Sequence, residues 1–351
     1  MKIGIHHTPG SFSERWLTYC DEHKIPYKLV DAMRSDIVAQ LSDCDGFMWH
    51  WNHADYRAQL FARQLIYSLE LGGMKVFPNS RTVWHFDDKL GQKYLFDSLG
   101  IDTVQTYIFY DKETAIAWAK EALYPKVFKL RGGAGSSNIR LVGSFSAAQR
   151  LIRKSFGRGY PLIDRWSLFK DGFWHMRRNA NAQTFLKIAP KFIRLFLKSN
   201  KEKLLPRQKG YVYFQDYIPG LEFDDRLVVI GDRCFFIRRG VRKNDFRASG
   251  SGILSYNHVM LDTSIVKKAF SYTGAIGSQA LAFDFVYERR TGKYYILEIS
   301  YCFWRSAYDN CEGFWDSDLV WHDEEINPQF FIIEDFIHSL QRKNIPALRE
   351  C

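Results

Sequence analysis

The chain has 351 residues, of which 46% are hydrophobic and 25% are charged, and its formal net charge is +10. This composition is that of an ordinary folded protein, and the length suits two or three lobes with cores of their own. Apolar runs stay short of the roughly 18 residues that a membrane-spanning helix needs, and the first residues are too quickly polar for a signal peptide. Six cysteines without CxxC spacing are expected to be reduced thiols in a cytoplasmic protein.

The positive charge is concentrated in one segment. Residues 153–209 hold 15 lysines and arginines against 3 acidic residues, a net charge of +12. The rest of the chain therefore has a net charge of about −2. The basic character belongs to this segment rather than to the protein as a whole.

Strand and helix signals alternate through the first 78 residues. Short apolar runs are separated by segments whose apolar residues recur every three or four positions. The expected strands are 2–6, 27–31, 46–50 and 75–78, and the expected helices are 12–24 and 55–71. This alternation predicts a small α/β domain with a parallel sheet.

Four histidines, His6, His7, His50 and His53, fall at or just beyond two of these expected strand ends. Ligands often bind at the carboxyl ends of parallel strands. The spacing matches no metal-binding motif, so we favour a substrate-facing role over a metal site.

Residues 79–100 predict a helix that Asn79 or Ser80 begins and Gly100 ends. Lys89 would lie in the middle of this helix, where a surface lysine with partners four residues away is the plain alternative to a functional role.

Residues 125–137 predict a strand that ends at Lys129 and runs into a loop of glycine, alanine and serine. Such a loop lets backbone N–H groups approach phosphate oxygens, and a lysine at its edge supplies a positive charge. The GxxxxGK[ST] pattern is absent, and many ordinary hairpins have similar loops. The preceding lysine is what favours a phosphate site here.

Two further hairpin patterns follow. A strand is expected at 211–218, and two more flank a turn at Gly231-Asp232, with a cationic loop at 242–252 beyond them. That loop has the composition of segments that clamp phosphates or a carboxylate.

The hairpin at 279–300 carries Asp284 on one arm and Glu298 on the other, with Ser300 on the same face as Glu298. Two carboxylates and a hydroxyl form an oxygen-rich site suited to Mg²⁺. Taken alone, the pattern also fits an ordinary hairpin with solvated acids.

In this order, these blocks resemble the ATP-grasp superfamily, in particular its ribosomal-protein-glutamate-ligase-like members. The resemblance covers about residues 75–156 and 210–303. It implies an α/β and α+β architecture, namely an ATP-grasp fold after a short N-terminal α/β (pre-ATP-grasp) domain. The implied domains are 1–78 and 79–351, the second carrying a basic aromatic insert at about 157–208.

The resemblance also implies ATP and Mg²⁺ as cofactors and assigns roles to individual residues. The residues expected to contact ATP phosphates are Lys89, Lys129, Gly132, Gly133, Gly135 and Ser136. Those expected to hold adenine and ribose are Gln215, Asp216, Tyr217, Ile218 and Glu222. The expected metal ligands are Asp284, Glu298 and Ser300, and the expected catalytic cations are Arg226, Arg242 and Arg247.

Two positions depart from the family pattern. Ser300 stands where the family usually has Asn, which weakens the third metal contact, and Gln215 stands where Glu is frequent. Because Glu298 is retained, the resemblance implies an active carboxylate–amine ligase, in which ATP converts a carboxylate to an acylphosphate that an amine then attacks. Such catalysis needs positioning and charge neutralisation rather than a side-chain nucleophile.

The insert at 157–208 combines aromatic and basic residues, and its second half predicts an amphipathic helix. It is either a lid that packs on the core, a contact for an anionic membrane at the inner face, or a site for an acidic glycan or RNA. No RNA-binding signature supports nucleic acid.

A second aromatic cluster lies at 301–321, with acids between the rings. It suits carbohydrate or amine recognition, or it closes the core over a C-terminal helix expected at 328–342.

We interpret the chain as an ATP- and Mg²⁺-dependent carboxylate–amine ligase, in the context of surface-glycan or secondary-metabolite tailoring. The alternatives are an ATP-grasp kinase of a small molecule or sugar and a non-catalytic nucleotide-binding module.

Overall fold

The computed structural model describes residues 1–133, 138–161, 206–241 and 252–342. Contacts divide the chain into two compact units. The larger unit contains Met1–Phe86, Leu99–Asp102 and Leu221–Cys351, and the smaller contains Asp87–Ser98 and Thr103–Gly220. The larger unit joins the first strands to the last helix, so the expected domain boundary after residue 78 stays a prediction.

The first sheet of the larger unit confirms the predicted α/β alternation. Its strands are β1 (Ile3–His6), β2 (Tyr27–Val30), β3 (Gly46–Trp49) and β4 (Lys75–Phe77), and its helices are α1 (Ser13–Glu22), α2 (Ile37–Gln40) and α3 (Tyr56–Leu71). The strands pair in parallel in the order β2-β1-β3-β4. The winding direction therefore reverses between β1 and β3, which places the loops after these two strands at a switch point.

The second sheet of the larger unit is antiparallel. Its strands are β9 (Phe223–Ile230), β10 (Arg233–Gly240), β11 (Leu254–Ser255), β12 (Ala280–Glu288), β13 (Lys293–Ser300), β14 (Phe314–Trp315) and β15 (Trp321–His322). The order is β13-β12-β9-β10-β14-β15, with β11 paired to β10. Both predicted hairpins are confirmed, and Gly231 takes the positive φ of +59° that the β9–β10 turn requires.

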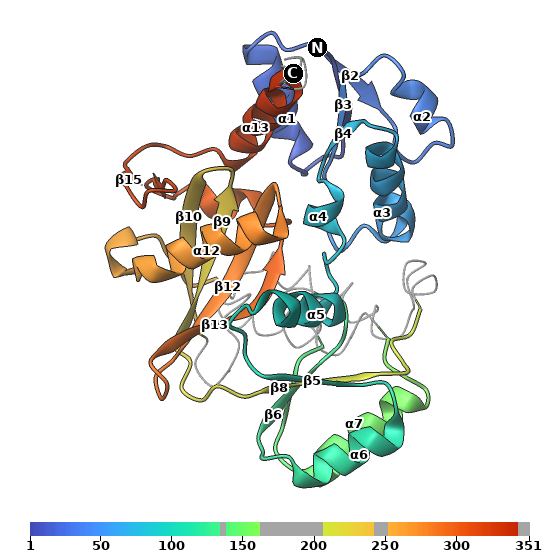
Figure 1. Ribbon diagram of the computed structural model, residues 1–351, viewed down its shortest axis with the longest axis vertical. Helices are drawn as coiled ribbons and strands as arrows, with labels where there is room; N and C mark the ends of the chain where they lie inside the picture. The colour runs from blue at the N-terminus through green and yellow to red at the C-terminus, as the bar shows by residue number, and fades with distance from the viewer. Residues whose placement is uncertain (134–137, 162–205, 242–251, 343–351) are drawn as a thin grey trace, which may run out of the picture. The chain divides into compact units, whose positions relative to one another are not determined.

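The two sheets of the larger unit share one core. Val228 and Phe235, from one face of the second sheet, pack in the same cluster as the first sheet and helix α13 (Pro328–Arg342). Helix α12 (Thr263–Ile276) contacts β9, β10 and β12, and α13 lies beside α1 (Figure 1). The remaining short helices described in this unit are α4 (Ser80–Val83), η1 (His258–Met260) and η2 (Arg305–Tyr308).

The smaller unit contains one antiparallel sheet with two helices on one of its faces. Its strands are β5 (Thr106–Phe109), β6 (Lys126–Lys129), β7 (Arg140–Val142) and β8 (Val212–Asp216), in the order β5-β8-β6-β7. Phe128 and Phe214 pack under α6 (Lys112–Glu121) and α7 (Phe145–Phe156). Because side chains alternate along a strand, Lys129 and Gln215 lie on the opposite face.

The single helix predicted for residues 79–100 is wrong. The chain forms α4, then a break, then α5 (Lys89–Leu99). Asp87 has a φ of +52° in the break, a conformation that ends a helix. Lys89 therefore begins a helix and is only 5% exposed, so the surface-lysine alternative is also wrong. Asn79 caps α4 by accepting from Thr82 N–H, and Gly100 follows α5 with a φ of +62°, as predicted.

The aromatic cluster after β13 belongs mainly to the core. Tyr301, Phe303 and Tyr308 are at most 6% exposed and pack with Ile333 and Phe336 of α13. The packing alternative is therefore confirmed for these three rings, whereas Trp304 is 77% exposed.

Candidate functional site

The predicted site residues occur in both compact units. Those in the smaller unit are Lys89, Lys129, Gly132, Gly133, Gln215, Asp216, Tyr217 and Ile218, and those in the larger unit are Glu222, Arg226, Asp284, Glu298 and Ser300. Four others lie outside the described residues: Gly135, Ser136, Arg242 and Arg247. Residues 162–205 of the insert and the cationic loop from 242 to 251 lie outside them as well.

In the smaller unit, Lys129 is held on the face of the sheet away from α6 and α7. It is 6% exposed, and its Nζ donates to Gln215 Oε1 at 2.6 Å. Gln215 in turn donates to Thr106 Oγ1 at 3.1 Å, so the Gln215 side chain has its own fixed position. The Lys129 ammonium group is therefore held in a fixed position by the Gln215 amide.

Lys89 meets the start of the glycine-rich loop. Its Nζ donates to Gly133 C=O at 2.9 Å, and its backbone N–H donates to Arg131 C=O at 2.9 Å. The fold thus places both lysines predicted to contact phosphate within one unit and against the segment that leaves β6.

Two acids that the sequence analysis did not assign brace this loop. Asp87 accepts from Gly133 N–H at 2.7 Å, and Asp88 forms a two-bond ion pair with Arg131. The pair with Asp88 raises the pKa of Arg131 above its ordinary value. A Cβ at Gly132 would lie 3.1 Å from the Asp87 carboxylate, so this glycine permits the close approach.

Asp216, the next residue on β8, points to the opposite face of the sheet from Gln215 and forms an ion pair there. Its carboxylate lies 2.5 Å from Lys126 Nζ, and its backbone N–H donates to Gln105 C=O at 2.9 Å. Its side chain is therefore committed to an ion pair beside α6 and α7. Glu222, predicted to bind ribose, is well exposed and pairs with Arg289 at 2.7 Å.

In the larger unit, charged side chains cross four neighbouring strands on one sheet face. Asp284 on β12 lies opposite Arg226 on β9 and Glu298 on β13. Asp284 also accepts from Arg239 of β10 at 2.9 Å, and Arg239 forms a two-bond pair with Asp224. Burial would lower the pKa of Arg239, but Asp284 and Asp224 raise it above the ordinary value. Burial raises the pKa of Asp224 to about 6.

Asp224 and Arg239 were missed from the sequence, although a signal for them exists. Counting outward from the turn at Gly231-Asp232 pairs position 224 with 239 and position 225 with 238. Each pair joins an acid to an arginine, so the register of the hairpin predicts two cross-strand ion pairs.

The expected metal ligands fit a divalent cation in part. Asp284 and Glu298 are directly cross-strand, where Cβ atoms are about 5 Å apart, a spacing that suits two carboxylates on one cation. Ser300 instead closes a local turn: its hydroxyl donates to Cys302 C=O at 2.9 Å and accepts from Cys302 N–H at 3.1 Å. Within the described ranges, no three His, Cys, Asp or Glu side chains group as a metal site. A metal here would rely on the two carboxylates.

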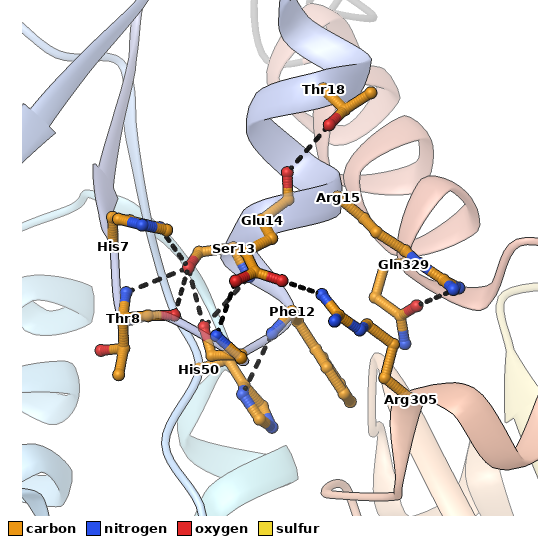
Figure 2. A network of polar contacts seen from close by, with 12 residues as sticks. His7, Thr8, Phe12, Ser13, Glu14, Arg15, Thr18, His50, Arg305 and Gln329 are labelled. Atoms are coloured by element: carbon orange, nitrogen blue, oxygen red, sulfur yellow. Dashed lines mark hydrogen bonds and ion pairs between the residues drawn. The ribbon is translucent and has the colours of Figure 1, made fainter.

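The histidines predicted near the strand ends have separate environments at the switch point (Figure 2). His50 stacks on Phe12 with ring centroids 3.7 Å apart and accepts from Phe12 N–H at 3.4 Å. Burial lowers the pKa of His50 to about 3, so the ring is neutral. His6 is also buried and accepts from Ala32 N–H, whereas His7 is exposed and contacts Ser13 Oγ. A substrate-facing role for these four histidines stays a prediction.

The start of α1 is joined by ion pairs to the chain that follows the β12–β13 hairpin. Glu14 accepts from Gly10 N–H at 2.7 Å and pairs with Arg305, and Arg15 donates to Gln329 Oε1 at 3.0 Å (Figure 2). Arg15 also pairs with Asp309 at 2.6 Å. Tyr301, directly after β13, donates to Trp51 C=O at 2.6 Å. The end of β13 is thereby fixed against the switch point of the first sheet.

No protein-family model and no curated protein matches the sequence. Solved structures do match along almost the whole chain. The D-alanine–D-alanine ligase of Bacillus anthracis complexed with ATP has a TM-score of 0.57 at 12% identity, covering 98% of this chain and 99% of that one. The ATP-grasp ligase PsnB complexed with a minimal precursor has a TM-score of 0.55 at 11% identity, covering 96% and 98%.

A RimK domain ATP-grasp protein from Sphaerobacter thermophilus is also similar, with a TM-score of 0.53 at 15% identity, covering 96% of this chain and 100% of that one. The chain therefore has the ATP-grasp fold, and the resemblance drawn from its motifs is confirmed for the fold. Among the matched structures, the Bacillus anthracis ligase is complexed with ATP, and a biotin carboxylase domain from Hydrogenobacter thermophilus is complexed with MgADP. No described helix is long and apolar enough to span a membrane.

Proposed function

We propose that the protein is an ATP- and Mg²⁺-dependent carboxylate–amine ligase that works through an acylphosphate. The observation that carries the proposal is the cross-strand pair Asp284 and Glu298, flanked by two buried arginines, in a chain with the ATP-grasp fold. Lys89 and Lys129, both held by hydrogen bonds in the smaller unit, support a phosphate-binding role there. The context of surface-glycan or secondary-metabolite tailoring is part of this proposal.

Each group has a task in such a reaction. Mg²⁺, when bound, would neutralise phosphate charge and orient the transferred group, and Asp284 and Glu298 are the residues that would hold it. Lys89 and Lys129 would hold phosphate oxygens. Arg226 would face the charge that develops on the transferred phosphoryl group, because its guanidinium is already fixed by Asp284 at 3.1 Å and by Cys302 C=O at 3.3 Å.

The first test is calorimetric titration of a non-hydrolysable ATP analogue, with and without Mg²⁺, into the wild type and Glu298→Gln. We expect metal-dependent binding that the substitution weakens about tenfold or more, because one of two anionic ligands is lost. The matched control is Glu288→Gln on the same hairpin, four residues and about 13 Å along β12 from Asp284. Equal affinities for the wild type and Glu298→Gln would contradict the metal assignment.

ADP release then separates the ligase from its alternatives. A ligase releases ADP when a carboxylate and an amine are both present. A kinase needs one hydroxyl acceptor and leaves a stable phosphorylated product. A non-catalytic module binds the nucleotide without turnover, an outcome that the Ser300 turn would help to explain.

A further inference from the structure

Two adjacent acids on β9 form two buried ion pairs with two adjacent arginines on β10. Asp224 accepts two hydrogen bonds from Arg239, at 2.5 and 2.8 Å, and Asp225 accepts two from Arg238, at 2.7 and 2.9 Å. Both acids are nearly inaccessible, at 4% and 0% exposure. The pairs are therefore close to equivalent in chemistry and burial.

Strand alternation places the two pairs on opposite faces of the sheet. Arg238 lies over the Phe223 ring at 3.8 Å and donates to Met260 C=O at 3.2 Å, away from the expected metal ligands. Arg239 shares its face with Asp284, and its Nη2 lies 2.9 Å from Asp284 Oδ2. The side chain of Arg239 therefore reaches across β9 to the neighbouring strand.

Asp284 receives a guanidinium group at each of its oxygens. Arg226 lies 3.1 Å from Oδ1, and Arg239 lies 2.9 Å from Oδ2. Both guanidiniums oppose the binding of a cation by this carboxylate. Asp224 offsets that effect, because it binds Arg239 through two bonds and adds a negative charge to the same face.

Asp224 determines the net charge of the named side chains on this face. Asp224, Asp284 and Glu298 carry three negative charges against the two positive charges of Arg226 and Arg239. Removing the charge of Asp224 would leave the set neutral. It would also leave Arg239 with Asp284 as its remaining carboxylate in this set. A charge this close to a bound cation contributes to the strength of its binding.

We propose that Asp224 is a positioning residue for the divalent cation, acting through Arg239 to orient Asp284 and adding a negative charge on the same sheet face. The inference rests on the proposed function, since it assumes that Asp284 and Glu298 hold the metal. Asp225, in the same strand and equally buried, has no such role.

The experiment compares Asp224→Asn with Asp225→Asn. Thermal unfolding measures the structural cost of each substitution. Titration with Mn²⁺ at a fixed concentration of ATP analogue, followed by the electron paramagnetic resonance of free Mn²⁺, measures the metal affinity without requiring turnover. We expect both variants to lose thermal stability, but only Asp224→Asn to weaken the apparent Mn²⁺ affinity, by about tenfold or more. Metal-free affinity for the analogue should remain unchanged in both.

Equal Mn²⁺ affinities in the wild type and Asp224→Asn would overturn the inference while leaving the proposed function intact. Equal losses in the two variants would also overturn it, because the effect would then be general. If the wild type itself shows no metal-dependent binding, the proposed function fails, and this inference fails with it. Should Asp224→Asn not fold, Arg239→Lys and Arg238→Lys make the same comparison, since lysine keeps the charge and loses the two-bond geometry.

Discussion

At the scale of single residues, strand alternation separates groups that look alike in the sequence. Lys126 and Lys129 both lie on β6 and are 7% and 6% exposed. Lys126 pairs with Asp216 and lies 4.9 Å from the Tyr107 ring centroid, on the face that α6 and α7 cover. Lys129 instead contacts the neutral amide of Gln215. The two lysines therefore lie on opposite faces of the sheet, and Lys129 is the one predicted to contact phosphate.

We expect Lys129→Met to weaken binding of the ATP analogue by about tenfold or more, because a phosphate loses a desolvated positive partner. Lys126→Met is the matched control. It should lower the thermal midpoint, because Asp216 is left without this cation, and it should leave nucleotide affinity within about twofold. Calorimetry on both variants checks the expectation. Equal losses of affinity in the two would show that the phosphate site has been misplaced.

At the scale of secondary-structure elements, a close contact fixes α13 on the first sheet. Gly46 on β3 faces Phe336 of α13, and a Cβ at Gly46 would lie 2.7 Å from the Phe336 ring. Both residues belong to the core that the two sheets of the larger unit share. Glycine at this position therefore permits the helix to approach the strand.

Gly46→Ala should destabilise the protein by about 1–3 kcal/mol, the usual cost of overpacking a core. The control is Gly274→Ala within α12, where an added Cβ meets nothing within 4 Å. That change should be neutral or stabilising by up to about 1 kcal/mol, because alanine is the better helix former. In thermal unfolding, the midpoint of Gly46→Ala should fall, and the midpoint of Gly274→Ala should stay the same or rise. An unchanged midpoint for Gly46→Ala would mean that α13 can move away at little cost.

Elements whose pattern is local were predictable from the sequence. The four strands of the first sheet and the β9–β10 and β12–β13 hairpins follow from apolar runs and glycine-containing turns. The break before α5 was not predictable, because the φ of Asp87 goes with its bond to Gly133, 46 positions away. Likewise, Ser300 appeared to be a ligand from spacing alone, whereas the turn at Cys302 engages its hydroxyl.

At the scale of the whole molecule, the described residues on either side of 162–205 are joined to each other within the smaller unit. Tyr160 and Gln208 form an antiparallel bridge through two backbone hydrogen bonds of 2.9 and 2.8 Å. Arg207 donates to the carbonyls of Arg158 and Gly159, and the Tyr160 ring packs against Phe128. The two ends of the segment that lies outside the described residues are therefore held side by side by the fold itself.

This arrangement predicts that residues 162–205 can be replaced by a short Gly-Ser linker, since the bridged ends need only a modest loop-closure cost. The replacement removes 10 basic and 3 acidic residues, so the net charge falls from +10 to +3. We expect the variant to fold and to bind the ATP analogue within about twofold of the wild type.

If the insert serves an anionic partner, the wild type will sediment with phosphatidylserine vesicles or bind an acidic polysaccharide, and the variant will not. A variant that aggregates or loses its cooperative unfolding would instead show that the insert packs on the core. Binding of vesicles by both proteins would move the anionic contact to another part of the chain.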